Sequence, residues 1–194
     1  MLSNTCNTRD MGCYKIGDRD ILPGKLYRSD RLDKLDSQDI NKINNLGIKR
    51  IVDFRSDFEK MKEPNVKIGN VEYIELPITA DSIIRKQLPM ILKGELSKDV
   101  REFLRDANKD FVIKHSKIFS KFLKILITDP KPTLYHCSMG KDRTGFAAFL
   151  IYNILGLDES VILEDYLQSN TYTENSKFNI EYQKENTARV LGVN

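Results

Sequence analysis

The sequence predicts a protein of the α/β class, because β-rich apolar runs alternate along the chain with segments of helical periodicity. The β-rich runs lie at residues 22–29, 48–55, 71–76 and 133–136. The helical patterns lie at residues 35–47, 111–126 and 146–155. A chain of 194 residues with 40% hydrophobic and 30% charged positions buries one sizeable core. We therefore expect a single domain over residues 1–194, and not a disordered, collagen-like or membrane-spanning chain.

The predicted strands differ in how they begin and end. Residues 22–29 lead from a turn into a short strand. Residues 48–55 are β-rich and end in charged side chains, as expected for a buried strand that delivers polar groups at its carboxyl end. Residues 71–76 alternate between apolar and polar side chains and lead into a loop that reaches Asp81. A short apolar strand at residues 133–136 follows two prolines.

The first predicted helix opens at residues 35–40 and ends at Gly47. In the later half of residues 85–128, apolar side chains recur at helical spacing with lysines on the outer face. The apolar set is Phe111, Val112, Ile118, Phe119, Phe122, Leu123 and Leu126, and the outer lysines are Lys114, Lys117, Lys121 and Lys124. The last clear helix is almost wholly apolar, spans residues 146–155 and ends at Gly156.

The net charge of +3 is too mild to indicate nucleic-acid binding, so no nucleic-acid partner is expected. The charge is unevenly distributed. Residues 85–128 carry eleven Lys or Arg against five Asp or Glu, whereas residues 158–194 carry three against seven. This distribution suits phosphorylated substrates better than nucleic acid.

The cysteine content favours a reducing compartment. Cys6, Cys13 and Cys137 are odd in number and form no disulfide framework. The amino end has no apolar leader, and no apolar stretch is long enough to span a bilayer. A cytoplasmic location without an integral membrane segment is the default expectation.

The strand, loop and helix at residues 133–155 hold the most informative stretch, HCSMGKDRTG at 136–145. Cys137 follows an apolar strand, and Arg143 returns six positions later where the next helix begins. Backbone N–H groups of such a glycine-containing loop converge with the helix amino terminus into a cradle for a phosphate-sized anion. The same field favours the thiolate of Cys137, which makes it a nucleophile. Arg143 can offer a bidentate fork to two phosphate oxygens. These roles together indicate covalent phosphoryl transfer.

Other chemistries fit this stretch poorly. The neighbouring His136 should point to the opposite face of the strand from Cys137, which favours a structural hydrogen bond over proton transfer. No Cys-x-x-Cys is present, so no metal site is expected. The pair Gly140-Lys141 lacks the upstream glycine and the following Ser or Thr of a nucleotide-binding loop. No cofactor is therefore expected.

The stretch from His136 to Gly145 resembles the signature loop of cysteine-dependent protein tyrosine and dual-specificity phosphatases. Further motifs narrow the resemblance to the bacterial tyrosine and lipid phosphatases typified by secreted enzymes of mycobacteria and Listeria. These motifs are NTRDMG at 7–12, LYRS at 26–29, IVDFRS at 51–56 with Glu59 downstream, and EDYLQSN at 164–170. The likeness spans about residues 4–193.

This resemblance implies a cysteine-dependent phosphatase fold with a central, mostly parallel sheet flanked by helices, and a helical lid over residues 82–108. It implies activity on phosphotyrosine, often on phosphoserine or phosphothreonine, and on phosphoinositides. Cys137 then attacks phosphorus, and Arg143 and the loop amides stabilise the equatorial oxygens. The substrate-binding residues are Ser138, Met139, Gly140, Lys141, Thr144 and Gly145. In addition, the Thr144 hydroxyl is placed to donate a hydrogen bond to the sulfur.

Two assignments stay open. The resemblance and the position of the carboxyl favour Asp142 as the acid that protonates the leaving group, but Asp81 in a separate loop is the alternative. Lys141 and the basic segment favour substrates with extra phosphates, such as phosphoinositides; the alternative is that Lys141 balances Asp142 and that the lysines form a solvated face. The physiological substrate and the oligomeric state are not indicated.

One departure from the family pattern concerns the backbone. The family commonly has two glycines where this chain has Gly12 followed by Cys13, so a position that favours positive φ is strained or the turn differs.

Two functions of other classes compete with the phosphatase hypothesis. The chain could be a catalytically weak phosphate-binding module, or a sulfurtransferase-like enzyme with a cysteine in a similar loop. Retention of both Cys137 and Arg143 argues against the first, and the run Arg143-Thr144-Gly145 with the amino-terminal motifs argues against the second.

Overall fold

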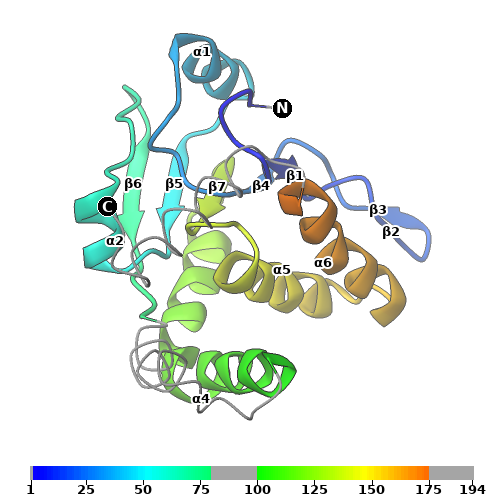
Figure 1. Cartoon of the computed structure of the whole chain (residues 1–194). Coiled ribbons are helices and arrows are strands. Elements are labelled where there is room, and N and C mark those ends of the chain that lie inside the picture. Colours follow the sequence, from blue (N-terminus) through cyan, green and yellow to red (C-terminus); the bar gives the residue numbers. More distant parts are fainter. Residues whose placement is uncertain (1, 80–99, 175–194) are drawn as a thin grey trace, which may run out of the picture.

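A five-stranded sheet forms the centre of the computed structural model, which describes residues 2–79 and 100–174 (Figure 1). The strand order is β1-β4-β7-β5-β6. The strands are β1 (Arg9–Asp10), β4 (Leu26–Ser29), β7 (Thr133–His136), β5 (Arg50–Asp53) and β6 (Glu72–Glu75). The last four are mutually parallel, and only β1 pairs antiparallel, with β4. The predicted α/β class with a mostly parallel sheet is confirmed.

The register of the sheet aligns the carboxyl ends of its three middle strands. Ser29 pairs with His136, and Asp53 pairs with His136 on the other side. The residue that follows β7 is Cys137, so the cysteine leaves the sheet at the same edge where β4 and β5 end. Ligand sites of open parallel sheets lie outside such an edge.

Five helices surround the sheet in the described part of the chain: α1 (Ser37–Asn45), α2 (Asp57–Lys62), α4 (Val100–Thr128), α5 (Asp142–Leu155) and α6 (Glu159–Glu174). Helix α1 begins where the Asp36 carboxylate accepts the Asp39 N–H at 2.9 Å, and the chain leaves it through Gly47 at φ 68°. Helix α5 begins at Asp142, within the loop that was predicted to precede it, and ends at Gly156 as expected.

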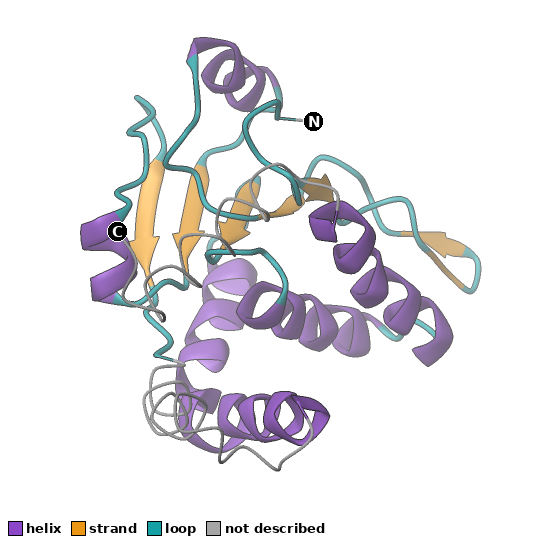
Figure 2. Cartoon of the chain, viewed as in Figure 1, coloured by secondary structure: helices purple, strands orange, loops and turns teal. Residues whose placement is uncertain are grey.

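Two apolar clusters cover the two faces of the sheet. One joins Val52 and Tyr135 to residues of α4, α5 and α6, and the other joins Ile51 and Leu134 to Ile43 of α1. Consecutive strand residues point to opposite faces, and because both faces are covered, β5 and β7 are buried at every position. Figure 2 shows the same layering, with α4, α5 and α6 gathered on one side of the sheet and α1 on the other.

Helix α4 follows the predicted amphipathic pattern with one exception. Phe111, Phe119 and Phe122 are buried, and the four predicted outer lysines are exposed. Val112, expected on the apolar face, is instead 57% exposed, because it lies about 100° around the helix from Phe111.

The sequence interpretation missed three short features. The strands β2 (Lys15–Ile16) and β3 (Arg19–Asp20) form a separate two-stranded hairpin, and β1 and α2 were not predicted. Residues 82–99 of the expected lid lie outside the described residues, and 100–108 belong to α4. Within residues 2–79 and 100–174, no helix has the length and apolar character needed to cross a membrane.

Candidate active site

Cys137 lies directly after β7 and is 2% exposed as a free thiol. His136 is fully buried, and its ring contacts Asn65, with 3.2 Å between Nε2 and Nδ2. Burial lowers the pKa of His136 and outweighs the opposing charge of Asp53, so the imidazole is neutral at pH 7. This surrounding matches the structural role expected for His136.

Residues outside the signature loop donate hydrogen bonds to its carbonyl groups. Three successive carbonyls accept hydrogen bonds from the scaffold: Ser138 O from Arg31 N at 3.2 Å, Met139 O from Asn7 Nδ2 at 3.0 Å, and Gly140 O from Arg28 Nη2 at 2.9 Å. In a planar trans peptide the N–H points away from the carbonyl. The N–H groups of the next residues therefore point into the loop.

Among residues 2–79 and 100–174, the inward N–H groups of the loop have no hydrogen-bond acceptor. None of the N–H groups from Ser138 to Arg143 donates to another residue of the described chain. They lie at the amino terminus of α5, which is where the sequence predicts an anion cradle.

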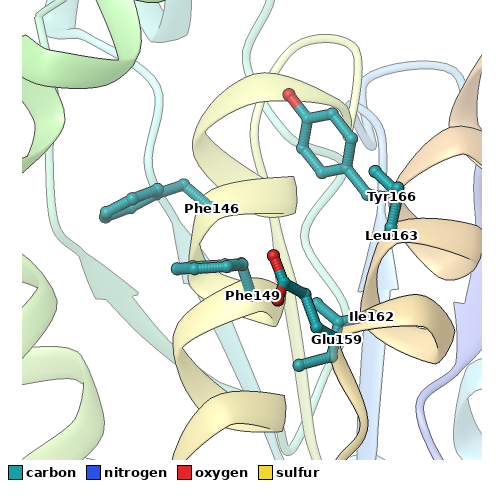
Figure 3. A pocket seen from close by; sticks show the side chains of 6 residues that line it. All are labelled: Phe146, Phe149, Glu159, Ile162, Leu163 and Tyr166. Atoms are coloured by element: carbon teal, nitrogen blue, oxygen red, sulfur yellow. The ribbon is translucent and has the colours of Figure 1, made fainter.

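Gly140 is required by the geometry of this loop. Its φ of 65° lies in the left-handed region, and a Cβ there would come within 2.6 Å of the Ser29 carbonyl oxygen. Gly145 is tightly packed as well, since a Cβ there would come within 2.9 Å of the ring of Tyr166, whose side chain is drawn in Figure 3. Both glycines of the loop are thus explained by close approach.

Arg143 emerges from the first turn of α5 and is clamped by Glu59. Its Nη1 and Nη2 each donate to a different carboxylate oxygen of Glu59 at 2.7 Å. Nη1 also lies 3.3 Å from the Phe54 carbonyl oxygen and 3.2 Å from that of Ile78. These four hydrogen bonds fix the orientation of the Arg143 guanidinium group.

The pKa values of this pair keep both partners charged. Burial would raise the pKa of Glu59, but the hydrogen bonds and charge of Arg143, with further hydrogen bonds from Ser138 and Ser56, lower it to about 2. Burial would likewise lower the pKa of Arg143, and the hydrogen bonds to Glu59 reverse this and raise it. The guanidinium is therefore cationic at pH 7.

Helix α2 places Glu59 by a capping box. The Ser56 side chain caps the Glu59 N–H, while the Glu59 carboxylate accepts the Ser56 N–H at 2.8 Å. The Ser138 hydroxyl of the loop hydrogen-bonds to the same carboxylate. Glu59 was quoted in the family resemblance without a role; the spacing Ser56-x-x-Glu59 is the sequence signal that could have identified this helix start.

The remaining predicted site residues take different positions. Asp142 is exposed at the first position of α5, and Lys141 is half-buried at the helix cap. Thr144 is buried, and its hydroxyl oxygen has no hydrogen-bond partner among the described residues, so the expected bond to the Cys137 sulfur is not formed in this structure. Asp81, the alternative acid, lies outside the described residues. No group of three or more His, Cys, Asp or Glu suited to a metal occurs within the described ranges.

A strand-end cysteine, a loop of inward amides and a clamped arginine together define the anion-binding loop of the cysteine-dependent phosphatase class. The chain belongs to the tyrosine phosphatase family, whose sequence model matches residues 1–194.

Two curated relatives and one solved structure are similar to this chain. A Cupriavidus necator protein named as a candidate tyrosine-protein phosphatase is 32% identical over 89% of this chain and 63% of its own length. The triple specificity protein phosphatase PtpB of Mycobacterium tuberculosis is 29% identical over 77% of this chain and 62% of its own length. The catalytic core of the PP-IP phosphatase SIW14 from S. cerevisiae covers 89% of this chain and 82% of its own, with 14% identity and a TM-score of 0.46. This chain thus spans less than two thirds of the length of both curated relatives.

Proposed function

We propose that residues 1–194 form a single catalytic domain that hydrolyses phosphomonoesters through a phosphocysteine intermediate. The observation that carries this proposal is the loop around Cys137, whose carbonyls are bound from outside while its N–H groups have no acceptor among the described residues. A dianionic phosphate supplies the missing acceptors. Membership of the tyrosine phosphatase family supports the same chemistry.

The reaction proceeds in two steps. The Cys137 thiolate forms a bond to phosphorus as the ester oxygen departs with a proton from a general acid. Water then attacks the phosphocysteine and gives a proton back to the carboxylate of the general acid, which releases inorganic phosphate and restores the thiolate. Arg143 and the loop amides stabilise the equatorial oxygens, whose charge must be matched in both transition states. Ser138, Met139, Gly140, Lys141, Thr144 and Gly145 are the substrate-binding loop of this proposal.

Asp142 is our proposed general acid. It is exposed at the start of α5, on the turn that carries Arg143, and a carboxyl there is accessible to the leaving group of a substrate held in the loop. Asp81 remains the alternative.

The substrates we propose are phosphotyrosine proteins, with phosphoserine or phosphothreonine proteins and phosphoinositides as further candidates. The half-buried Lys141 beside the loop adds a positive charge that suits a substrate with a second phosphate. The relative PtpB bears triple specificity in its name, which supports a broad substrate range. Nucleic acid is not among the proposed partners, and a cytoplasmic location is proposed.

A substrate panel tests the proposal. Aryl phosphate, phosphopeptides and phosphoinositides are offered to the wild type, to Cys137→Ser and to the control Cys13→Ser, which alters an exposed thiol. Turnover by the wild type and the control, and none by Cys137→Ser, is expected. Phosphate binding without turnover would instead favour the phosphate-binding module. Absence of lipid turnover would remove phosphoinositides from the substrates.

A further inference from the structure

Asp165 on α6 lies at the centre of a buried network behind the signature loop. Its side chain is 3% exposed and accepts hydrogen bonds from three side chains. These are Arg28 Nη1 at 2.7 Å, Tyr14 Oη at 3.1 Å and Arg9 Nε at 3.4 Å. Ser169, one turn further along α6, accepts from both arginines at 3.2 and 3.3 Å. One carboxylate thus serves two buried guanidinium groups.

The network reaches the loop through the same two arginines. Arg28 uses Nη1 for Asp165 and Nη2 for the Gly140 carbonyl, so its planar fork joins the helix to the loop directly. Arg9 donates to the Asn7 side chain, and Asn7 in turn donates to the Met139 carbonyl at 3.0 Å. Two of the three outward carbonyls of the loop therefore depend on these arginines.

Charge explains why Asp165 is needed in this place. Burial and the neighbouring charge of Arg28 lower the pKa of Arg9, and Asp165 opposes both effects. Without the carboxylate, two buried cations would face each other with no counter-charge, and their side chains would move apart or toward water. Arg28 is fully buried, so any such movement removes its hydrogen bond to Gly140.

We propose that Asp165 is a positioning residue for catalysis, acting through Arg28 to orient the peptide between Gly140 and Lys141. Because that peptide is planar, holding the Gly140 carbonyl toward Arg28 turns the Lys141 N–H into the phosphate cradle. Loss of the bond frees the peptide to rotate and removes one preorganised donor from the equatorial oxygens. The inference rests on the proposed phosphatase activity and adds a distant helix to its site.

Kinetics of three variants and a double mutant test this role. Asp165→Asn removes the charge at constant shape, and Arg28→Lys keeps a buried charge pair but cannot bridge two acceptors with a planar fork. Tyr14→Phe is the matched control, because it removes a neutral donor from the same carboxylate. The fourth protein combines Asp165→Asn with Arg28→Lys. Thermal midpoint, kcat and KM on an aryl phosphate, and inhibition by orthovanadate are measured for each.

We expect Asp165→Asn and Arg28→Lys each to lower kcat and weaken orthovanadate inhibition on the order of 10²-fold, with a smaller change in KM. The double mutant should be no worse than the poorer single mutant, and Tyr14→Phe should resemble the wild type. Additive losses in the double mutant, or a folded Asp165→Asn with wild-type kcat and inhibition, would overturn the proposal. If Asp165→Asn does not fold, a folded Arg28→Lys with wild-type kcat and orthovanadate inhibition would overturn the proposal.

The positioning role of Asp165 can be tested even if the chain does not hydrolyse phosphomonoesters. If the wild type turns over no aryl phosphate, calorimetric binding of inorganic phosphate replaces the kinetics. Weaker binding by Arg28→Lys than by Tyr14→Phe would then support the positioning role, and equal binding would overturn it.

Discussion

The carboxylate of Glu59 binds both terminal nitrogens of Arg143, at 2.7 Å each. The two residues are 84 positions apart, and each is the other's main ionic partner at the rim of the signature loop. The same carboxylate also accepts a hydrogen bond from Ser138 within the loop. Glu59 therefore links Arg143 to Ser138 of the signature loop.

Replacement of Glu59 should impair catalysis. Gln keeps one acceptor oxygen but presents an amide to the second Arg143 nitrogen, so the fork loses its fixed orientation. We expect Glu59→Gln to lower kcat on an aryl phosphate on the order of 10²-fold, as small misplacements of catalytic groups do. Glu75→Gln, at an exposed ion pair with Lys60, is the control and should leave kcat unchanged. Equal activity of both variants would contradict a positioning role for Glu59.

The free energy of unfolding at acidic pH should depend on the ion pair between Glu59 and Arg143. The pKa of Glu59 is about 2 in the folded protein, against an ordinary value of 4.5. The contribution of the Glu59 carboxylate to the free energy of unfolding is therefore complete above about pH 4.5 and is lost as the pH falls toward 2. Urea unfolding should show a larger difference in the free energy of unfolding between the wild type and Glu59→Gln at pH 6 than at pH 3. A difference that is constant or grows on acidification would refute this.

The choice of general acid can be tested by leaving-group dependence. A general acid contributes about 10²–10⁴-fold when the leaving group is a poor one and little when it departs unaided. Asp142→Asn should therefore lose most activity on alkyl phosphates and least on 4-nitrophenyl phosphate, while Asp81→Asn should not. The reverse pattern would assign the role to Asp81.

Gly140 should not tolerate a side chain. Gly140→Ala combines a left-handed φ of 65° with a Cβ 2.6 Å from the Ser29 oxygen. Gly17→Ala, at φ 57° with nothing within 4 Å, isolates the backbone cost of about 1–2 kcal/mol. Chemical denaturation should show a larger loss for Gly140→Ala, and its turnover should fall with it. Equal losses would mean that the loop shifts away without cost.

Cys13 carries backbone strain that can be relieved. Its φ of 72° confirms the positive value expected where the family commonly has glycine. Cys13→Gly should raise the unfolding free energy by about 0.5–1 kcal/mol after the added freedom of the unfolded chain is subtracted, with unchanged turnover. Asn70→Gly, at φ 63°, should gain less, because Asn adopts this region readily. No gain at Cys13 would show that the turn is unstrained.

Much of the fold was predictable because its signals are local. Apolar runs, turn residues and caps within a few positions predict the strands β4, β5, β6 and β7 and the helix α1. The missed strands have two residues each, too few for a pattern, and α2 has six. Val112 was misplaced because periodicity defines a stripe, while its edges depend on what packs against the helix.

The sequence by itself determined which residues form the signature loop and where Cys137 and Arg143 lie in it, because these residues are consecutive between an apolar strand and a helix. The tertiary structure alone decided which carboxylates support that loop. Glu59 and Asp165 come from helices on either side of it, separated from Arg143 and Arg28 by 84 and 137 positions. Such pairs depend on the path of the chain around the sheet, since a buried guanidinium needs a counter-charge wherever the packing brings one within reach.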